Sequence, residues 1–292
     1  MAGSSATRLI LTSGGIVPAP ESLPPTSLDL LEVRRQSGEG SRCRFGCALG
    51  KNLLGHAFED RHYARIVEHK GKEIAMFGVY DGHKGGEVAD FLQQYLFDAI
   101  LSHPRFDVNP KEAIREAYLA LDKRILDLGS VRRSGSTATT CLLFDGSKLI
   151  VANVGDSRAV LCRGGEAVVV SVDHEPQKPE EREMVESKGG EVSLTLGGIY
   201  RVDRRLAMSR AFGDYDLKDH ITVEPDIWEG ELSSDDFFIV ASDGLWHKVT
   251  SEEAVSVVLE EDEAVVAAEE LVELAKVKRE TDDITIVVVT LK

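Results

Sequence analysis

The sequence predicts an α+β fold in which helices cover the faces of antiparallel β-sheets. Four strand-like apolar runs between residues 137 and 171 follow one another through short turns, which is typical of an antiparallel meander. Amphipathic helical segments lie before and after this stretch and do not alternate with its strands. Such segregation of helices and antiparallel strands indicates α+β architecture.

Two helices are expected before the meander. Apolar residues recur at helical spacing over 88–100, directly after an Asp-Gly-His sequence. A second helix is expected to begin at Asn109-Pro110, where asparagine supplies the N-cap and proline the first turn, and to extend through Leu128. We expect the two to pack as an antiparallel pair.

The strands of the meander are expected at 137–144, 148–154, 158–161 and 167–171. A third helix fits 180–188 and ends at a Gly-Gly pair. Residues 250–253 read Thr-Ser-Glu-Glu, which is a capping box for a fourth helix. A fifth helix spans about 263–276, before a final β-rich run over 284–291.

Composition excludes several partners. With 34 basic against 50 acidic residues, the net charge of −16 disfavours nucleic acid and anionic membrane surfaces. No apolar stretch has the length of a transmembrane helix, and the N-terminus lacks the pattern of a signal peptide. We therefore expect a cytoplasmic or nuclear protein; organellar targeting is the alternative, because the first twenty residues contain Ser, Thr and one Arg but no acid.

Domain organisation is expected to be simple. Residues 1–40 are rich in Ser, Pro and Gly and are expected to form a flexible tail, and 41–292 a single domain. The four cysteines are too few for a disulfide scaffold. Cys43 and Cys47 have the spacing of a metal-binding pair, but no second Cys/His cluster completes a tetrahedral site, so we expect buried thiols.

Three Asp-Gly pairs follow apolar runs: Asp81-Gly82 after 74–80, Asp145-Gly146 after 137–144, and Asp243-Gly244 after 236–242. Asp-Gly is a common hairpin turn, and Asp145-Gly146, between two predicted strands, is expected to be only that. A carboxylate held at the end of a buried strand is costly unless a cation or hydrogen-bond donors compensate it. Asp81 and Asp243 are therefore candidate metal ligands.

Other acidic residues extend the candidate set, most of them at predicted strand edges or turns: Glu59, Asp60, Asp156, Asp214, Asp282 and Asp283. Oxygen-only ligand sets favour hard cations such as Mg²⁺ or Mn²⁺. Taken singly, each of these residues is as readily explained as a turn or cap residue. Their combination with the surrounding motifs is what favours a metal site.

Seven motifs from about Phe45 to Leu291 carry a resemblance to a known family: Phe58-Glu59-Asp60, Tyr80-Asp81-Gly82-His83, and the stretches at 134–138, 151–158, 206–214, 241–246 and 281–285. In this order they resemble the metal-dependent serine/threonine phosphatases of protein phosphatase type 2C. The residues of the motifs look most similar to those of plant members. The resemblance implies a four-layer α/β/β/α sandwich with two Mg²⁺ or Mn²⁺ ions at one end. It also implies that a metal-bridged hydroxide attacks phosphorus in line.

By position, the resemblance implies that Asp81 bridges both ions, Glu59 and the Gly82 carbonyl bind one, and Asp243 and Asp282 bind the other. His83 would protonate the departing Ser or Thr oxygen. Asp60 would orient a metal-bound water. Asp156 would help to hold a weaker third ion, or would instead be a structural partner of Arg158; both readings stay open. Arg210 and Asp214 are expected to brace the core.

Three positions depart from the family pattern. Gly55 stands where many members have an arginine that binds the substrate phosphate, so His56, Arg61 or Lys84 would have to replace it. His247 replaces an aspartate, which weakens the third-ion proposal. Asp283 replaces an asparagine and adds negative charge beside the site.

The expected function is thus dephosphorylation of phosphoserine and phosphothreonine in proteins. The alternatives are a weakly active or non-catalytic protein that binds phosphorylated partners or a kinase, and a hydrolase of small phosphoesters. Expected partners are phosphoprotein substrates and kinases, and we expect a monomer. A hormone-receptor partnership is not expected, because the stretch 189–202 lacks the tryptophan that such relatives insert into the receptor.

Overall fold

The computed structural model describes residues 33–51, 55–129 and 131–292, and the body formed by Val33–Lys292 is built on two large antiparallel β-sheets. The six-stranded sheet has the order β1 (Val33–Glu39), β2 (Cys43–Gly50), β16 (Ile284–Leu291), β15 (Phe237–Ala241), β9 (Arg158–Arg163) and β10 (Glu166–Val169). The five-stranded sheet has the order β14 (Asp226–Glu231), β8 (Lys148–Val154), β7 (Ala138–Phe144), β4 (Lys72–Tyr80) and β3 (Arg61–His69).

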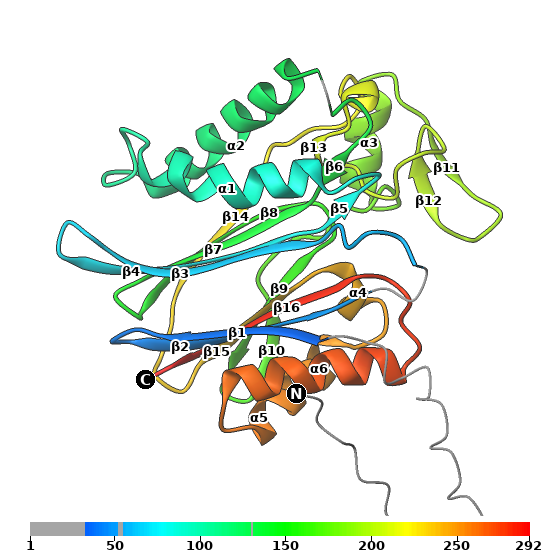
Figure 1. Ribbon diagram of the computed structural model, residues 1–292. Helices are drawn as coiled ribbons and strands as arrows, with labels where there is room; N and C mark the ends of the chain where they lie inside the picture. The colour runs from blue at the N-terminus through cyan, green and yellow to red at the C-terminus, as the bar shows by residue number, and fades with distance from the viewer. Residues whose placement is uncertain (1–32, 52–54, 130) are drawn as a thin grey trace, which may run out of the picture. The chain divides into compact units, whose positions relative to one another are not determined.

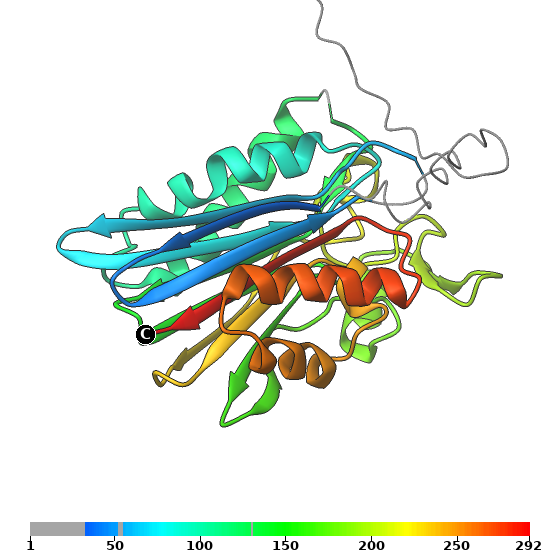
Figure 2. The same cartoon turned by 60° about the horizontal axis from the view of Figure 1, so that its bottom comes forward.

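The two sheets stack, and each has its outer face covered by a pair of helices (Figures 1 and 2). Helices α1 (Glu87–Leu101) and α2 (Pro110–Asp127) cover the five-stranded sheet, and α5 (Ser251–Glu260) and α6 (Ala264–Val277) cover the other. Between the sheets, the Phe77 ring lies 5.4 Å from that of Phe45 and 5.8 Å from that of Phe238, centroid to centroid. The expected α/β/β/α order of layers is confirmed.

Local signals place the helix ends where the sequence predicts them. The Asn109 side chain accepts a hydrogen bond from the backbone N–H of Glu112, and Pro110 opens α2. At the start of α5, Thr250 and Glu253 form the expected reciprocal capping box. The third and fifth predicted helices correspond to α3 (Pro179–Ser187) and α6.

The hairpin that joins β7 to β8 turns through Asp145 and Gly146. Both have positive φ angles, 50° and 70°, as the two central residues of a type I′ turn do, and Ser147 completes the three-residue connection, since Phe144 pairs with Lys148. This Asp-Gly pair is a turn, as expected.

Smaller elements gather at one end of the sheets. Strands β5 (Gly82–His83), β6 (Gly135–Ser136) and β13 (Phe212–Gly213) form a three-stranded sheet, and β11 (Val192–Leu194) pairs with β12 (Tyr200–Val202). The short helix α4 (Asp243–Trp246) follows β15 at the same end as β5 (Figure 1). The chain therefore leaves both sheets toward one region.

Strand β1 corrects one sequence-based expectation. Val33–Glu39, assigned above to the tail 1–40, pair along their whole length with β2 and form the edge of the six-stranded sheet. Their side chains are mostly exposed and give little apolar signal. As an edge strand, β1 pairs on one side only. Residues 1–32 of the expected tail lie outside the described residues.

The cysteines are buried free thiols, as the sequence predicts. All four are buried and unpaired, and burial raises the pKa of Cys43 and of Cys47 to about 12. Such thiols are poor metal ligands and poor nucleophiles.

None of the helices among the described residues has the length and apolar character needed to cross a membrane.

Candidate active site

One end of the sandwich receives a carboxylate from each sheet. Asp81 follows the last residue of β4, and Asp243 follows β15 after Ser242 and opens α4. Because consecutive residues of both strands are buried, the positions where the chains emerge are held firmly. Asp81 and Asp243 therefore meet between the ends of the two sheets, as the sequence predicts.

Glycine follows each of these aspartates because the backbone of a distant segment of the protein passes directly against the glycine. A Cβ atom on Gly82 would lie 2.5 Å from the Glu59 carbonyl oxygen. One on Gly244 would lie 2.1 Å from the carbonyl oxygen of Asp283. No side chain fits so close to a backbone oxygen. At Gly146 the nearest atom to an added Cβ would instead belong to a side chain, that of Arg42, at 2.4 Å, so only the first two pairs allow close backbone approach.

The two segments that approach these glycines are hydrogen-bonded to each other. The backbone N–H of Glu59 donates a 2.8 Å hydrogen bond to Oδ2 of buried Asp283, and Glu59 Oε1 accepts a bond of 2.9 Å from Gly85 N. The loop before β3 is thus attached both to the start of β16 and to the segment after β5. Asp283, which the sequence marked only as an extra charge, holds the candidate ligand Glu59 in place.

The carboxyl groups at this end repel one another. Burial, together with the charges of Asp60, Asp243 and other nearby acids, raises the pKa of Asp81 well above its usual value. Burial and neighbouring aspartates likewise raise the pKa of Asp60 and of Asp156. The pKa of Asp243 is also raised, by burial first, although the charge of His247 opposes the shift.

Two carboxylate oxygen atoms in this cluster lack hydrogen-bond partners. Among the described residues, Oδ2 of Asp60 and Oδ1 of Asp156 are buried and bond to no protein group. Buried polar atoms without partners are rare and indicate a ligand, an ion or water. An all-oxygen, negatively charged donor set of this kind fits a hard divalent cation.

The described side chains are not closed around a single point. Over 33–51, 55–129 and 131–292, no three His, Cys, Asp or Glu side chains are arranged to hold a metal ion. The fit therefore rests on charge, burial and donor chemistry. It does not rest on coordination geometry.

His83 lies beside these acids and is held by Asp214. Its Nε2 is 2.5 Å from Asp214 Oδ2, and Lys84 Nζ lies 3.5 Å from Oδ1 of the same carboxylate. Asp214 is buried, which alone would raise its pKa, but the hydrogen bond from His83 and the charges of His83 and Lys84 lower the pKa below its usual value. A Cβ on Gly135 would lie 2.1 Å from Asp214 Oδ2, so only glycine leaves room for the pair.

Asp214 and Arg210 do not pair with each other. Both were expected to brace the core, but Asp214 bonds to His83, while the Arg210 guanidinium bonds to Glu181 on α3 with a shortest distance of 2.5 Å. Ser209 also donates to Glu181. The bracing expected of Arg210 is therefore directed to α3, and it fixes the segment that carries Asp214.

Glu181→Gln is expected to lower the free energy of unfolding by about 3 kcal/mol at pH 7, because it removes the nearest carboxylate from the buried Arg210 charge and leaves only the longer 3.6 Å contact with Asp226. Burial alone would raise the pKa of Glu181, but Arg210 and Ser209 outweigh it and lower the pKa below 4.5. The pair therefore stabilises the protein above pH 4.5, and this contribution falls as pH drops through the lowered pKa.

Thermal unfolding between pH 7 and 4 measures this effect. The matched control is Glu186→Gln on the same helix, whose ion pair with Arg182 is exposed; the control is expected to cost less than about 0.5 kcal/mol. Equal Tm values and equal pH slopes for both variants would contradict the account.

The structural alternative for Asp156 is wrong. Arg158 does not pair with it; its guanidinium forms a bidentate pair with Asp173, with a shortest distance of 2.5 Å. The Asp156 carboxyl lies instead in the repelling cluster near Asp243. Its place agrees with the metal-related reading.

The candidate phosphate contacts lie near the site but are engaged. The Arg61 guanidinium lies 2.5 Å from Asp90 and bonds to two backbone carbonyl oxygens, while Lys84 faces Asp214. His56 Nδ1 lies 2.9 Å from the Ala57 carbonyl oxygen. Gly55 has a φ of 80°, where an arginine would be strained.

His247 places an imidazole where the family pattern has an acid. Its Nε2 lies 3.3 Å from Asp243 Oδ2, one helical turn away. The imidazole therefore contacts the carboxylate of a candidate metal ligand.

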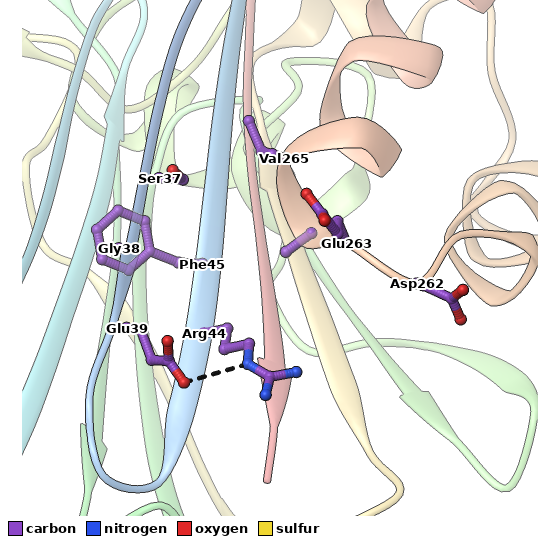
Figure 3. A pocket seen from close by; sticks show the side chains of 9 residues that line it. Ser37, Gly38, Glu39, Arg44, Phe45, Asp262, Glu263 and Val265 are labelled. Atoms are coloured by element: carbon purple, nitrogen blue, oxygen red, sulfur yellow. Dashed lines mark hydrogen bonds and ion pairs between the residues drawn. The ribbon is translucent and has the colours of Figure 1, made fainter.

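A cavity of about 500 Å³ lies at the other end of the six-stranded sheet (Figure 3). It lies between β1, β2 and the start of α6, and its lining includes Glu39, Arg44 and Glu263. Arg44, which lines the cavity, pairs with Thr290 near the C-terminal end of β16, whereas the carboxylate site lies at the other end of this strand, where it begins at Ile284. This cavity is therefore not part of the carboxylate site.

Comparisons with known proteins agree with the geometry. Residues 40–284 match the family model of protein phosphatase 2C. "Probable protein phosphatase 2C 28" of Arabidopsis thaliana is 46% identical over 257 residues, which cover 86% of this chain and 75% of the relative. "Probable protein phosphatase 2C 62" of rice (Oryza sativa subsp. japonica) is 44% identical, over 86% of this chain and 87% of its own.

A solved structure shares the fold. A solved phosphatase from a pathogenic strain of Toxoplasma gondii superposes with a TM-score of 0.77 at 21% identity, over 89% of this chain and 96% of that one. The fold and site thus define an α/β/β/α phosphatase. The chain belongs to the protein phosphatase 2C family, and its class of enzyme is the protein serine/threonine phosphatases.

Proposed function

We propose that the chain hydrolyses phosphoserine and phosphothreonine in proteins with two bound Mg²⁺ or Mn²⁺ ions. The observation that supports this is the cluster of buried, mutually repelling carboxyl groups between the ends of the two sheets. Such a cluster is costly in the absence of compensating positive charge. Family membership supports the same chemistry, because the family is metal-dependent in general.

Particular residues would hold the ions. Asp81 would contact both; Glu59 and the Gly82 carbonyl would contact one, and Asp243 with Asp282 the other. Asp156 would contribute to a weaker third ion, and Asp60 would orient a water in the site. When bound, such ions activate water as a nucleophile and neutralise phosphoryl oxygens.

The chain's own residues would orient the general acid and protonate the leaving oxygen. His83 would donate a proton to the departing Ser or Thr oxygen, and Asp214, at 2.5 Å, fixes the orientation of its imidazole. Lys84, on the same carboxylate and partly exposed, is the favoured phosphate contact, because its ammonium can turn from Asp214 to an incoming anion. Arg61 and His56 remain further candidates.

The non-catalytic alternative is not favoured. It rested on Gly55 and His247, and neither change removes a carboxylate of the cluster formed by Asp81, Asp60 and Asp243. A monomer in the cytoplasm or nucleus stays a prediction.

Turnover by the purified full chain tests the proposal. Hydrolysis of a phosphothreonine peptide is expected to require Mn²⁺ or Mg²⁺, to stop with a chelator and to return when the ion is restored. A small phosphoester serves as a second substrate that needs no peptide recognition. If neither substrate is hydrolysed in a metal-dependent way, the proposal is refuted.

A further inference from the structure

An arginine-rich surface adjoins the candidate active site. We define the arginine surface as five residues from two segments, the loop before β6 and the stretch from β12 to Arg205: Arg132, Arg133, Arg201, Arg204 and Arg205. Arg132, Arg204 and Arg205 have side chains that are 61%, 75% and 42% exposed. The β11–β12 hairpin lies at the same end of the sheets as β5 and β6 (Figure 1).

The two segments meet at the short helix η2 (Tyr215–Leu217). The Arg132 guanidinium lies 4.3 Å from the centroid of the Tyr215 ring, and its Nη2 is 3.4 Å from Asp216 Oδ1. Arg205 reaches the other oxygen of Asp216 at 3.7 Å. A single aspartate is therefore shared between two arginines.

Short connections link this surface to His83. Asp216 lies two residues after Asp214, the partner of His83. Ser134, adjacent to Arg133, donates a 2.8 Å hydrogen bond to the Gly85 carbonyl, and its own carbonyl accepts one of 3.0 Å from Asp214 N. The arginines consequently border the place where a phosphorylated side chain would enter.

The charge of the surface is not balanced within it. Arg204 pairs with the exposed side chain of Glu191 at 3.2 Å, and Arg132 and Arg205 share Asp216. Asp203, which lies between Arg201 and Arg204 in the sequence, contacts His220 at 2.6 Å and also interacts electrostatically with Arg205, so five arginines are set against three acids. Arg133 is exposed and forms no ion pair with any residue that the structure describes.

These pairs are also weak enough to be exchanged. Exposed ion pairs contribute little and are readily replaced by another carboxylate. Arginine binds carboxylates through paired N–H donors, which suits it to hold the side chains of Asp or Glu. In a chain with a net charge of −16, a local excess of positive charge is a directional signal for an acidic ligand.

We propose that the arginine surface binds acidic residues that flank the phosphorylated residue, so that the preferred substrates are phosphoserine and phosphothreonine in Asp/Glu-rich segments. The inference rests on the proposed phosphatase function and specifies its substrate class. Acidic flanks would be drawn to the arginines, whereas basic flanks would be repelled by them.

Three phosphothreonine peptides with the same central residues and with acidic, neutral or basic flanks test the inference. For the wild-type chain with Mn²⁺ at low salt, kcat/KM is expected to be about 10-fold higher for the acidic than for the basic peptide, as two or three exposed charge pairs would give. The ratio is expected to fall as salt is raised, because exposed pairs are screened.

Charge reversal identifies the surface responsible. Arg133→Glu, which breaks no ion pair among the described residues, is expected to reduce the acidic-to-basic ratio to about 2-fold or less. The matched control is Arg65→Glu, an exposed arginine on β3 with the same change in net charge. The control is expected to keep the wild-type ratio; an equal loss in both variants would overturn the assignment to the arginine surface.

A binding measurement separates this inference from the proposed function. Anisotropy of labelled phosphopeptides with the Asp81→Asn variant reports affinity without turnover. Equal Kd values for acidic and neutral peptides would overturn the inference even if the wild type hydrolyses both. Tighter binding of the acidic peptide by a chain that hydrolyses nothing would support the inference and refute the phosphatase proposal.

Discussion

Asp81→Asn is expected to lower kcat for a phosphothreonine peptide on the order of 10³-fold while the protein remains folded. The amide keeps the shape of the side chain but removes the charge that both proposed ions share. Since burial and neighbouring acids disfavour the Asp81 carboxylate, the metal-free variant is expected to have a Tm equal to or above that of the wild type. Added Mn²⁺ is expected to raise the Tm of the wild type only.

Asp145→Asn is the matched control for this variant. It makes the same change in the Asp-Gly pair that forms the β7–β8 turn, and asparagine can keep both the positive φ and the bond that Oδ1 accepts from Glu73 N. Activity and the Mn²⁺ response should match the wild type. If Asp81→Asn retained wild-type turnover, Asp81 could not be a shared ligand.

Gly244→Ala is expected to lower both stability and activity. Its methyl group would lie 2.1 Å from the Asp283 carbonyl oxygen, so the start of β16 must move away from α4. We expect a loss of about 2 kcal/mol in the free energy of unfolding. Activity should fall further than stability predicts, since Asp283 also holds the backbone of Glu59 through a 2.8 Å hydrogen bond.

Gly197→Ala controls for the loss of a glycine. This residue lies in the turn between β11 and β12, where the nearest atom to an added Cβ would be 3.9 Å away. Denaturant unfolding and peptide turnover measured on both variants decide the matter. Unchanged stability of Gly244→Ala would show that the two backbones can separate freely and would remove the proposed reason for glycine at this position.

Much of this site could be predicted from the sequence because its signals are local. An apolar run that ends in Asp-Gly marks Asp81 and Asp243, and capping residues such as Asn109 and Thr250 place the helices within a residue or two. The turn at Asp145 was separable from the other pairs, because strand-like runs lie on both sides of it.

Contacts between residues distant in the chain could not be predicted. Asp283 and Glu59 are separated by 224 residues, and His83 and Asp214 by 131, so no local pattern marks either hydrogen bond. Motif position led to the expectation that Asp214 would brace the core. The structure shows that its partner is the candidate general acid.

Edge strand β1 was missed for a different reason. Its side chains are mostly exposed, so the sequence of Val33–Glu39 resembles that of a polar tail. What makes it a strand is backbone pairing with β2, which depends on hydrogen bonds and not on side-chain pattern.

Anomalous diffraction from crystals of the full chain grown with Mn²⁺ tests the central claim most directly. The account predicts two manganese peaks that share Asp81, one beside Glu59 and the Gly82 carbonyl and the other beside Asp243 and Asp282. A crystal of an active, Mn²⁺-saturated protein with no peak at Asp81 would contradict it.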